Sequence, residues 1–446
     1  MNVSYRNQNI AVLGAGESGE SAAVLLLQEN AMITILDTAE ENKLRKKIDA
    51  LRERGIRVIA GLAAEYESAH GQYDLAVLSP GIDPSVPLVQ HFIQRRIRMI
   101  GELELAYEMC RCPIIGITGT NGKTTTTQLI EKMLLACGVK TVACGNIGPA
   151  FSAKVQESEH LDVMTLEISS FQLETIQRFR CEVAVWLGFA ADHLDRYASM
   201  EEYYAAKIRI FENQTEDDWA VVNLRDKLPP LKAKKITFSA YQSGGDFELR
   251  EGAIYFRGER VLAMADTKLR GSHNVENLMA ALGVGFVRGL AFAQMAAPLC
   301  EYKPLPHRCE SLRILDGVEW VNDSKGTNPD SVEKALHSET RRVVLIVGGK
   351  DKGFEYDLLT EIVVQKCRAV VTLGEMADRI ETLWRGRLPV ANAGWSLEKS
   401  VEFARELAQP GDVVLLSPGT SSFDMFKNYA DRGNQFRALV QALSAK

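Results

Sequence analysis

Short apolar runs and longer amphipathic stretches alternate along the first hundred residues of the chain. The apolar runs of strand length lie at residues 10–13, 33–36 and 75–78. Residues 21–30 between the first two runs carry apolar side chains at helical spacing. This alternation is typical of βαβ units around a parallel sheet, so the pattern predicts an α/β domain here.

The same alternation returns twice further along the chain. A second unit opens at the apolar run 113–117 and passes through a glycine-rich loop into a helix predicted over 124–136. The third unit begins near residue 308, and its predicted strands lie at 343–347, 369–373 and 413–416. Because 446 residues are too many for one hydrophobic core, we predict three α/β domains.

The domain boundaries are expected near Gly101 and near the Pro-Leu-Pro stretch at 304–306, where rigid prolines would hold two domains apart. No long Ser/Gly/Pro linker marks either boundary. The predicted domains are residues 1–101, 102–305 and 306–446.

Composition and charge place the chain among ordinary globular proteins. Hydrophobic residues make up 46% and charged residues 25%, which excludes a disordered or fibrous chain. The net charge of -6 argues against a nucleic-acid or anionic-membrane partner. The first residues lack the order of a signal peptide, and the apolar region 278–299 is interrupted by Arg288 and Gln294, as suits an interior helix. We therefore expect a soluble, cytoplasmic protein whose eight scattered cysteines are reduced.

A glycine-rich loop, Gly-Ala-Gly-Glu-Ser-Gly at 14–19, joins the first predicted strand to the first helix. Asp37 ends the next strand 18 residues after the loop, which completes a dinucleotide-binding fingerprint. Glycines let a phosphate approach the amides at a helix N-terminus, so a UDP moiety fits as well as a dinucleotide. The alternative is a tight turn without a ligand, and Glu17 would repel a pyrophosphate unless it turns outward. A second loop, Ser79-Pro80-Gly81, at the same sheet edge favours a binding site.

Residues 116–124, Gly-Ile-Thr-Gly-Thr-Asn-Gly-Lys-Thr, resemble a phosphate-binding loop between a strand and a helix. The strict GxxxxGK[ST] pattern would require glycine at 117, where this chain has isoleucine. The chemistry survives, because the glycines free backbone amides, Lys123 supplies positive charge and the Thr124 hydroxyl can bind Mg²⁺. We therefore predict ATP binding rather than a glycine turn alone.

The loop sequence Thr-Gly-Thr-Asn-Gly-Lys-Thr resembles the ATP loop of the Mur ligases and of their relative folylpolyglutamate synthase. Further motifs in family order are GNIG at 145–148, EISSFQL at 167–173, DHLD at 192–195, AKIR at 206–209, HNVEN at 273–277 and HRCE at 307–310. The chain is therefore identified as similar to the Mur ligase family. Within it, NDSKGTN at 322–328 and SPGTSSFD at 417–424 resemble the member that adds D-glutamate.

The resemblance implies a Rossmann-like N-terminal domain, a central P-loop-type ATPase domain and a Rossmann-like C-terminal domain. It implies ATP-dependent ligation of D-glutamate to UDP-N-acetylmuramoyl-L-alanine through an acyl phosphate, in peptidoglycan precursor synthesis. ADP and phosphate would be released, with ATP and two Mg²⁺ ions as cofactors. A monomer without nucleic-acid or membrane partners is expected.

The resemblance also implies roles for individual residues. ATP would be bound by Gly119, Thr120, Asn121, Gly122, Lys123, Thr124, Thr125, Asn274, Asn277, Arg308 and Asp323. The metal ions would be held by Thr124, Glu167, His193 and Lys207, and the catalytic residues would be Lys123, His193 and Lys207. The resemblance further implies that Lys207 is carbamoylated, and partial burial would favour the neutral amine that reacts with CO₂. Its alternative is a snorkelling lysine on an amphipathic helix at 201–213.

The same resemblance implies which residues contact each of the two substrates. The UDP substrate would contact Gly16, Glu17, Ser18, Gly19, Asp37, Ser79, Gly81 and Asn146. D-Glutamate would contact Lys325, Thr327, Lys352, Ser422, Phe423 and Tyr429. The chain departs from the family at Gly326 and Gly419, where alanine is more common.

Other classes remain open at this stage. The interpretation as an NAD(P) oxidoreductase would depend on the first glycine loop alone and would leave Lys123 without a functional role. A regulatory P-loop protein would bind ATP without needing Glu167 or Lys207 for turnover. Within the family, the acceptor could be another amino acid, or glutamate could be added to a folate, although a UDP-binding domain argues against a folate.

Overall fold

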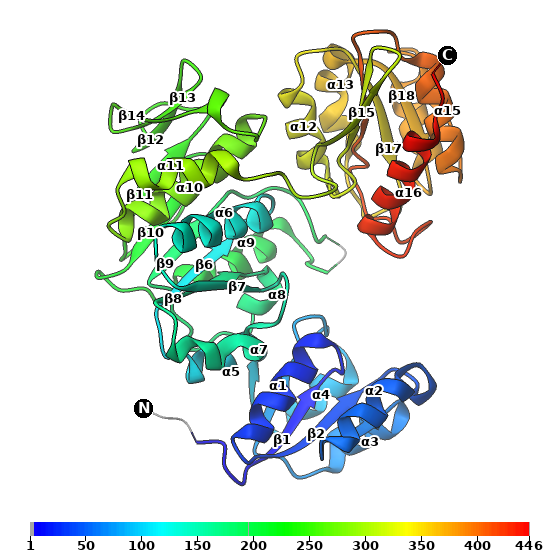
Figure 1. Cartoon of the computed structure of the whole chain (residues 1–446). Coiled ribbons are helices and arrows are strands. Elements are labelled where there is room, and N and C mark those ends of the chain that lie inside the picture. The colour runs from blue at the N-terminus through cyan, green and yellow to red at the C-terminus, as the bar shows by residue number, and fades with distance from the viewer. Residues whose placement is uncertain (1–3, 195, 446) are drawn as a thin grey trace.

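The structure is a computed structural model that describes residues 4–194 and 196–445 (Figure 1). Asp195 of the predicted DHLD motif lies outside the described residues. The chain forms three sheets in sequence order, each in its own α/β domain. In Figure 1 the N-terminal domain lies at the bottom, the middle domain above it and the C-terminal domain at the upper right. The predicted three-domain α/β architecture is confirmed.

The N-terminal domain is a parallel sheet of five strands in the order β3-β2-β1-β4-β5. The strands are β1 (Asn9–Leu13), β2 (Met32–Asp37), β3 (Arg57–Ala60), β4 (Leu75–Leu78) and β5 (Arg98–Gly101). The helices are α1 (Glu17–Gln28), α2 (Glu41–Glu53), α3 (Leu62–His70), α4 (Pro87–Gln94) and α5 (Glu102–Met109). Helices α1 and α2 cover one face of the sheet, and α3 and α4 cover the other. Because the strand order reverses between β1 and β4, the loops after these two strands frame the expected ligand crevice.

The middle domain is a sheet of nine strands in the order β14-β13-β12-β11-β10-β9-β6-β8-β7. The strands are β6 (Ile114–Thr118), β7 (Thr141–Gly145), β8 (Val163–Glu167), β9 (Val183–Trp186), β10 (Trp219–Asn223), β11 (Lys234–Ser239), β12 (Phe247–Arg250), β13 (Ala253–Phe256) and β14 (Glu259–Ala263). The helices are α6 (Lys123–Ala136), α7 (Phe151–Lys154), α8 (Ser170–Leu173), α9 (Met200–Ile208), α10 (Ser272–Val287) and α11 (Phe292–Glu301), with 3₁₀ turns η1 (Val155–Glu159), η2 (Arg209–Phe211) and η3 (Met264–Asp266). Strands β6 to β12 run parallel, so the carboxyl ends of β6, β8 and β9 meet at one edge.

The C-terminal domain is a sheet of six strands in the order β15-β16-β20-β17-β18-β19. The strands are β15 (Glu310–Leu315), β16 (Val318–Asn322), β17 (Val343–Gly348), β18 (Cys367–Leu373), β19 (Val390–Asn392) and β20 (Val413–Leu416). The helices are α12 (Pro329–Ser338), α13 (Thr360–Lys366), α14 (Ala377–Trp384), α15 (Leu397–Leu407) and α16 (Tyr429–Ala442), with the 3₁₀ turn η4 (Tyr356–Leu359). Only the edge pair β15–β16 is antiparallel among the described strands of this sheet. Helix α12 lies on the side of the C-terminal domain that faces the middle domain (Figure 1).

Two local predictions differ from the structure. The apolar region 278–299 was expected to form one interior helix, but α10 ends at Val287 and α11 begins at Phe292. Gly289 between them has φ +77°, a left-handed conformation that glycine adopts without strain and that ends a helix. The helix expected over 201–213 ends at Ile208 and continues as a 3₁₀ turn.

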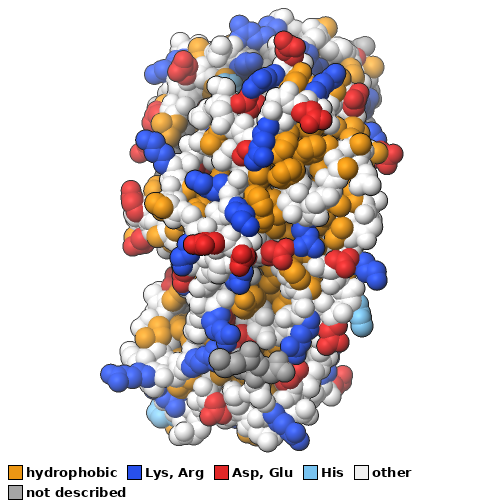
Figure 2. Space-filling view, turned by 90° about the vertical axis from the view of Figure 1, so that its left-hand side faces the viewer, with side chains coloured by type: hydrophobic (Ala, Val, Ile, Leu, Met, Phe, Trp, Pro, Cys, Tyr) orange, Lys and Arg blue, Asp and Glu red, His pale blue; other side chains and the backbone are white. Residues whose placement is uncertain are grey.

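The outer surface agrees with a chain of modest net charge. On the face shown in Figure 2, lysine and arginine side chains are interspersed with aspartate and glutamate, and hydrophobic side chains lie between them. Among the described residues, no helix combines the length and apolarity needed to cross a membrane.

Candidate active site

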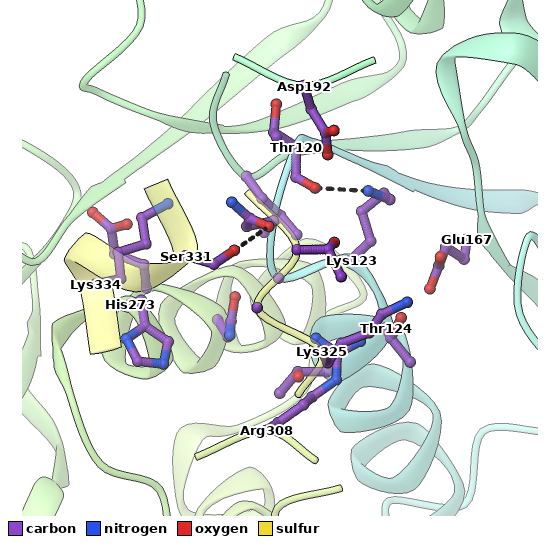
Figure 3. Close-up of a pocket in the computed structure, with 18 of the residues that line it drawn as sticks. Thr120, Lys123, Thr124, Glu167, Asp192, His273, Arg308, Lys325, Ser331 and Lys334 are labelled. Atoms are coloured by element: carbon purple, nitrogen blue, oxygen red, sulfur yellow. Dashed lines mark hydrogen bonds between the residues drawn. The ribbon is translucent and has the colours of Figure 1, made fainter. Parts of the chain in front are cut away.

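A cavity of about 290 Å³ opens where the carboxyl edge of the middle sheet faces the C-terminal domain. Figure 3 shows side chains from both domains converging on it, with Lys123 and Glu167 from the middle domain and Arg308 and Lys325 from the C-terminal domain. The predicted site residues that line it are Thr120, Asn121, Gly122, Lys123, Thr124, Thr125, Asn146, Glu167, His193, Lys207, Asn274, Asn277, Arg308, Asp323, Lys325 and Thr327. The structure thus brings together most of the residues predicted for ATP and metal.

The phosphate-binding loop lies between β6 and α6 and is closed against neighbouring elements. Gly122 has φ +85°, and a Cβ there would lie 2.4 Å from Asn277 Oδ1 of α10, so only glycine fits. The Lys123 ammonium donates hydrogen bonds to the carbonyls of Gly119 and Thr120, each at 2.9 Å. Burial lowers the pKa of Lys123. Its charge lies at the N-terminus of α6, where a helix favours an anion.

Glu167 lies at the end of β8 and is almost fully buried, at 2% exposure. Its Oε1 accepts a hydrogen bond of 2.7 Å from the Asn146 amide. Its Oε2 is buried without a hydrogen-bond partner among the described residues. A buried carboxylate oxygen with no partner is costly, and a cation in the cavity would satisfy it.

These residues fit Mg²⁺ chemistry. No described group of three or more His, Cys, Asp or Glu side chains forms a metal cage. Mg²⁺ is usually held by one or two carboxylates together with substrate phosphates rather than by a protein cage. One unpartnered carboxylate oxygen beside a phosphate-binding loop matches that donor set, with the Thr124 hydroxyl on the same cavity wall.

Lys207 and His193 line the same cavity from α9 and from the loop after β9. Lys207 is 1% exposed, and its ammonium donates to the Gly119 carbonyl at 3.0 Å and lies 4.8 Å from the centre of the Tyr203 ring. Burial, followed by the nearby charge of Lys123, lowers the pKa of Lys207 well below its usual value. Burial also lowers the pKa of His193 to about 4, so its imidazole is neutral at pH 7 and can bind a metal.

The C-terminal wall of the cavity carries a buried acid among cations. Asp323 accepts hydrogen bonds from the Ser417 hydroxyl at 2.8 Å and from the Cys309 amide at 3.1 Å. Burial raises the pKa of Asp323 to about 6. Burial and the nearby charge of Arg308 lower the pKa of Lys325 to about 8, and its ammonium lies 3.9 Å from the centre of the Tyr429 ring.

Several cavity residues were not predicted from the sequence. The polar ones include Asp192, Arg225, His273, Glu276, Ser331 and Lys334. His273 and Glu276 belong to the HNVEN motif, so that motif was the sequence signal that could have identified them as cavity residues. Arg225 forms an ion pair of 2.8 Å with Glu276 and lies over the Tyr241 ring, in a contact that no local pattern indicates.

The residues predicted for D-glutamate are only partly assembled. Thr327 and Lys325 line the cavity, and the Lys352 ammonium donates to Asp192 Oδ1 at 2.8 Å. Within the described chain, Ser422, Phe423 and Tyr429 are not part of the cavity wall. Ser422 is buried, whereas the Phe423 side chain is 68% exposed.

A second cleft of about 540 Å³ lies at the carboxyl edge of the N-terminal sheet. The predicted residues that line it are Gly16, Glu17, Ser18, Asp37, Ser79 and Gly81. Asp37 Oδ2 accepts from the Ala15 amide at 2.7 Å and so holds the glycine loop. Gly19 serves packing, because a Cβ there would lie 2.0 Å from the Gly14 carbonyl oxygen. Asn146 lies in the first cavity instead.

Comparisons with known proteins agree along the whole chain. Residues 8–101 match the Mur ligase MurD-like N-terminal domain, residues 117–285 the Mur ligase middle domain, and residues 307–419 the Mur ligase glutamate ligase domain. The chain is 40% identical to the UDP-N-acetylmuramoylalanine–D-glutamate ligase of Geotalea uraniireducens (strain Rf4), with 98% of each chain covered. It is 41% identical to that of Koribacter versatilis (strain Ellin345), with 99% of each covered.

Solved structures share the fold at low sequence identity. UDP-N-acetylmuramate-alanine ligase MurC from Thermotoga maritima superposes with a TM-score of 0.62 at 18% identity, covering 98% of this chain and 100% of that one. MurF ligase from the same organism, in complex with ADP, gives 0.60 at 17% identity, covering 99% and 97%. The chain belongs to the Mur ligase family, a class of ATP-dependent amide-bond-forming ligases. Within the family it groups with the UDP-N-acetylmuramoylalanine–D-glutamate ligases.

Proposed function

We propose that this protein joins D-glutamate to UDP-N-acetylmuramoyl-L-alanine at the expense of ATP, in peptidoglycan precursor synthesis. The observation that carries the proposal is the shared cavity, which combines a phosphate-binding loop, an unpartnered buried carboxylate and cations from a second domain. The similarity to D-glutamate ligases over nearly the full length supports the choice of acceptor.

The proposed reaction has two balanced steps. An oxygen of the L-alanine carboxylate attacks the γ-phosphorus of ATP, and ADP leaves with the bridging oxygen. The amine of D-glutamate then attacks the acyl carbon, phosphate leaves and the amine loses a proton. Lys123 of the middle domain and Arg308 of the C-terminal domain hold the phosphates, and Lys325 and Thr327 face the acceptor from the C-terminal wall of the cavity. Positioning and electrostatics do most of the work in such a transfer.

We propose Mg²⁺ as the cofactor beside ATP, with two ions. Thr124 and Glu167 would hold one ion, and His193 with a carbamoylated Lys207 the other. When bound, the ions neutralise the charge of the phosphates and of the attacked carboxylate. The neutral His193 and the lowered pKa of Lys207 support these assignments, because a metal ligand must be unprotonated and CO₂ reacts only with a neutral amine.

The remaining predictions extend the same proposal. The UDP end would lie in the N-terminal cleft, and Asn146 would contact the muramoyl peptide close to Glu167. The proposed domains are residues 1–101, 102–305 and 306–446. We propose a cytoplasmic location. A monomer would be sufficient for the activity, since one chain carries both sites.

Phosphate release tests this proposal. The protein is incubated with ATP, Mg²⁺ and UDP-N-acetylmuramoyl-L-alanine, and D-glutamate, L-glutamate or L-lysine is added in separate reactions. We expect turnover only with D-glutamate. Turnover with L-lysine instead would assign another acceptor, and no turnover in folded, ATP-binding protein would favour a regulatory nucleotide-binding protein.

Replacing Asp37 by alanine is expected to raise KM for the UDP substrate about tenfold or more, because a charged hydrogen bond near the uridine is lost. KM for ATP should not change, since the two cavities are separate. Steady-state kinetics with each substrate varied in turn measure both values. Asp49→Ala, on the exposed side of α2, is the matched control. An unchanged KM for the UDP substrate would contradict the proposed uridine site.

A further inference from the structure

The side chain of Asn121, in the centre of the phosphate-binding loop, is engaged by the C-terminal domain. Its amide donates to Asp330 Oδ2 at 2.6 Å and to Asn328 Oδ1 at 3.2 Å. Its carbonyl oxygen accepts from the Ser331 hydroxyl at 3.1 Å and from the Asn328 amide at 3.4 Å. All three partners lie at the first turn of α12.

Asn328 extends this contact to the other side of the cavity. It is 2% exposed and caps α12, where its Oδ1 accepts from the Ser331 amide at 2.9 Å. Its amide also donates to Asp192 Oδ2 at 3.1 Å. The second oxygen of Asp192 accepts from Lys352 at 2.8 Å. One capping residue therefore links the phosphate-binding loop, the loop after β9 and Lys352.

We call this hydrogen-bonded set the polar junction, and its members are Asn121, Asp192, Asn328, Asp330, Ser331 and Lys352. The junction is adjacent to residues that are proposed to bind the acceptor. Thr327 precedes Asn328 in the chain and lines the cavity, and Lys352 ends the hydrogen-bonded series. The loop on the other side is packed against α10, because Asn277 lies against Gly122 and accepts a hydrogen bond from the Thr126 hydroxyl of α6. A short series of hydrogen bonds to this packed loop fixes distance, and misplacement by about 1 Å can cost about 100-fold in rate.

We propose that Asn121 is a positioning residue, which couples the nucleotide loop to the amino-acid-binding domain rather than contacting ATP through its side chain. Asn121 and Asn328 together set the distance of Thr327 and Lys352 from the acyl carbon that the acceptor amine attacks. The inference rests on the proposed function in one respect, namely that the acceptor is held by these C-terminal residues. Asn121 was predicted to contact ATP because the whole loop motif was assigned to ATP together.

A charge exchange across the junction tests the proposal. Asn121→Asp places a carboxylate against Asp330 and should reduce kcat/KM for D-glutamate by about 30-fold or more. Asp330→Asn alone should cost about threefold, since one hydrogen bond is rearranged. The double variant Asn121→Asp/Asp330→Asn restores an amide–carboxylate pair beside Lys334, so it should recover at least about tenfold over Asn121→Asp. The dissociation constant of ATP, measured without the other substrates, should agree within about threefold between Asn121→Asp and the double variant, because both carry the same added carboxylate near the phosphates.

The alternative role predicts a different pattern. If the Asn121 side chain instead contacts ATP, then Asp330→Asn does not restore kcat/KM for D-glutamate in Asn121→Asp, and this result would overturn the proposal. Asp357→Asn, an equal charge change at an exposed site of the same domain, is the control and should match the unchanged protein.

A second measurement separates this inference from the proposed acceptor. Hydrogen exchange of the amides at 328–338 should rise in Asn121→Asp and fall back in the double variant, without any amino acid present. If exchange follows this pattern but D-glutamate gives no turnover, the junction stands and the acceptor is wrong. If exchange is equal in all variants, the junction is absent and the proposal fails.

Discussion

Replacing Lys207 by alanine is expected to lower kcat about 1,000-fold or more while ATP still binds, because a proposed metal ligand is removed. The amine is almost fully buried, hydrogen-bonded to Gly119 of the phosphate-binding loop and set over Tyr203. An ordinary lysine in such a place is unfavourable, as the lowered pKa indicates. Carbamoylation would convert that buried cation into a carboxylate group facing the metal. Phosphate release measures kcat, and calorimetry measures the ATP dissociation constant.

Two further variants distinguish a carbamate from a plain cation. Lys207→Arg keeps the positive charge but cannot react with CO₂ to form the same group, so it should be as inactive as the alanine variant. Adding acetate to the alanine variant should restore part of the activity, since it supplies a carboxylate to the vacated space. Lys232→Ala at an exposed position is the control. Full activity in Lys207→Arg would contradict the assignment of a carbamate at this position.

The phosphate-binding loop shows why part of the site could be predicted from the sequence. Its chemistry is local, because glycines, a lysine and a threonine at fixed spacing dictate both backbone shape and ligand. Glu167 was also predictable, since it follows an apolar run and so lies at a strand's carboxyl end.

Other contacts depend on how the domains meet, and no local pattern encodes that. The contacts of Asn121 and Asp192 cross from the middle to the C-terminal domain over more than 130 positions of sequence. Arg225 and Lys334 reach the cavity from loops or helices without a recognisable motif. Ser422 and Phe423 were assigned by motif and Tyr429 by its position in the resemblance, and in the described chain all three lie outside the cavity wall.

The antiparallel strands of the middle domain carried a sequence signal that the prediction did not use. Residues 251–252 read Glu-Gly and residues 257–258 read Arg-Gly, and each pair has positive φ at both positions. Two such residues between alternating strands are typical of tight hairpin turns. The resulting strands β12 to β14 extend the sheet edge away from the cavity, so missing them left the predicted site unaffected.

Replacing Glu167 by glutamine is expected to lower kcat about 100-fold or more and to raise the Mg²⁺ concentration needed for half-maximal rate, because a charged ligand is lost. Glutamine has almost the same shape and can still accept from the Asn146 amide, so the fold should persist. The oxygen that changes is the buried Oε2, which has no partner in the described residues. Its charge, rather than its volume, should therefore determine the result.

The Mg²⁺ dependence separates a metal ligand from a structural acid. ATP binding measured with Mg²⁺ should weaken in Glu167→Gln, whereas binding measured in a chelator should match the unchanged protein. Glu159→Gln, an exposed acid of the same domain, should behave as the unchanged protein in both conditions. If Glu167→Gln lost stability but kept its Mg²⁺ dependence, the carboxylate would be a capping acid for the turn at Ser169 and Ser170. The cavity would then bind phosphate through Lys123 and Arg308 alone, and another group would have to balance the charge of the attacked carboxylate.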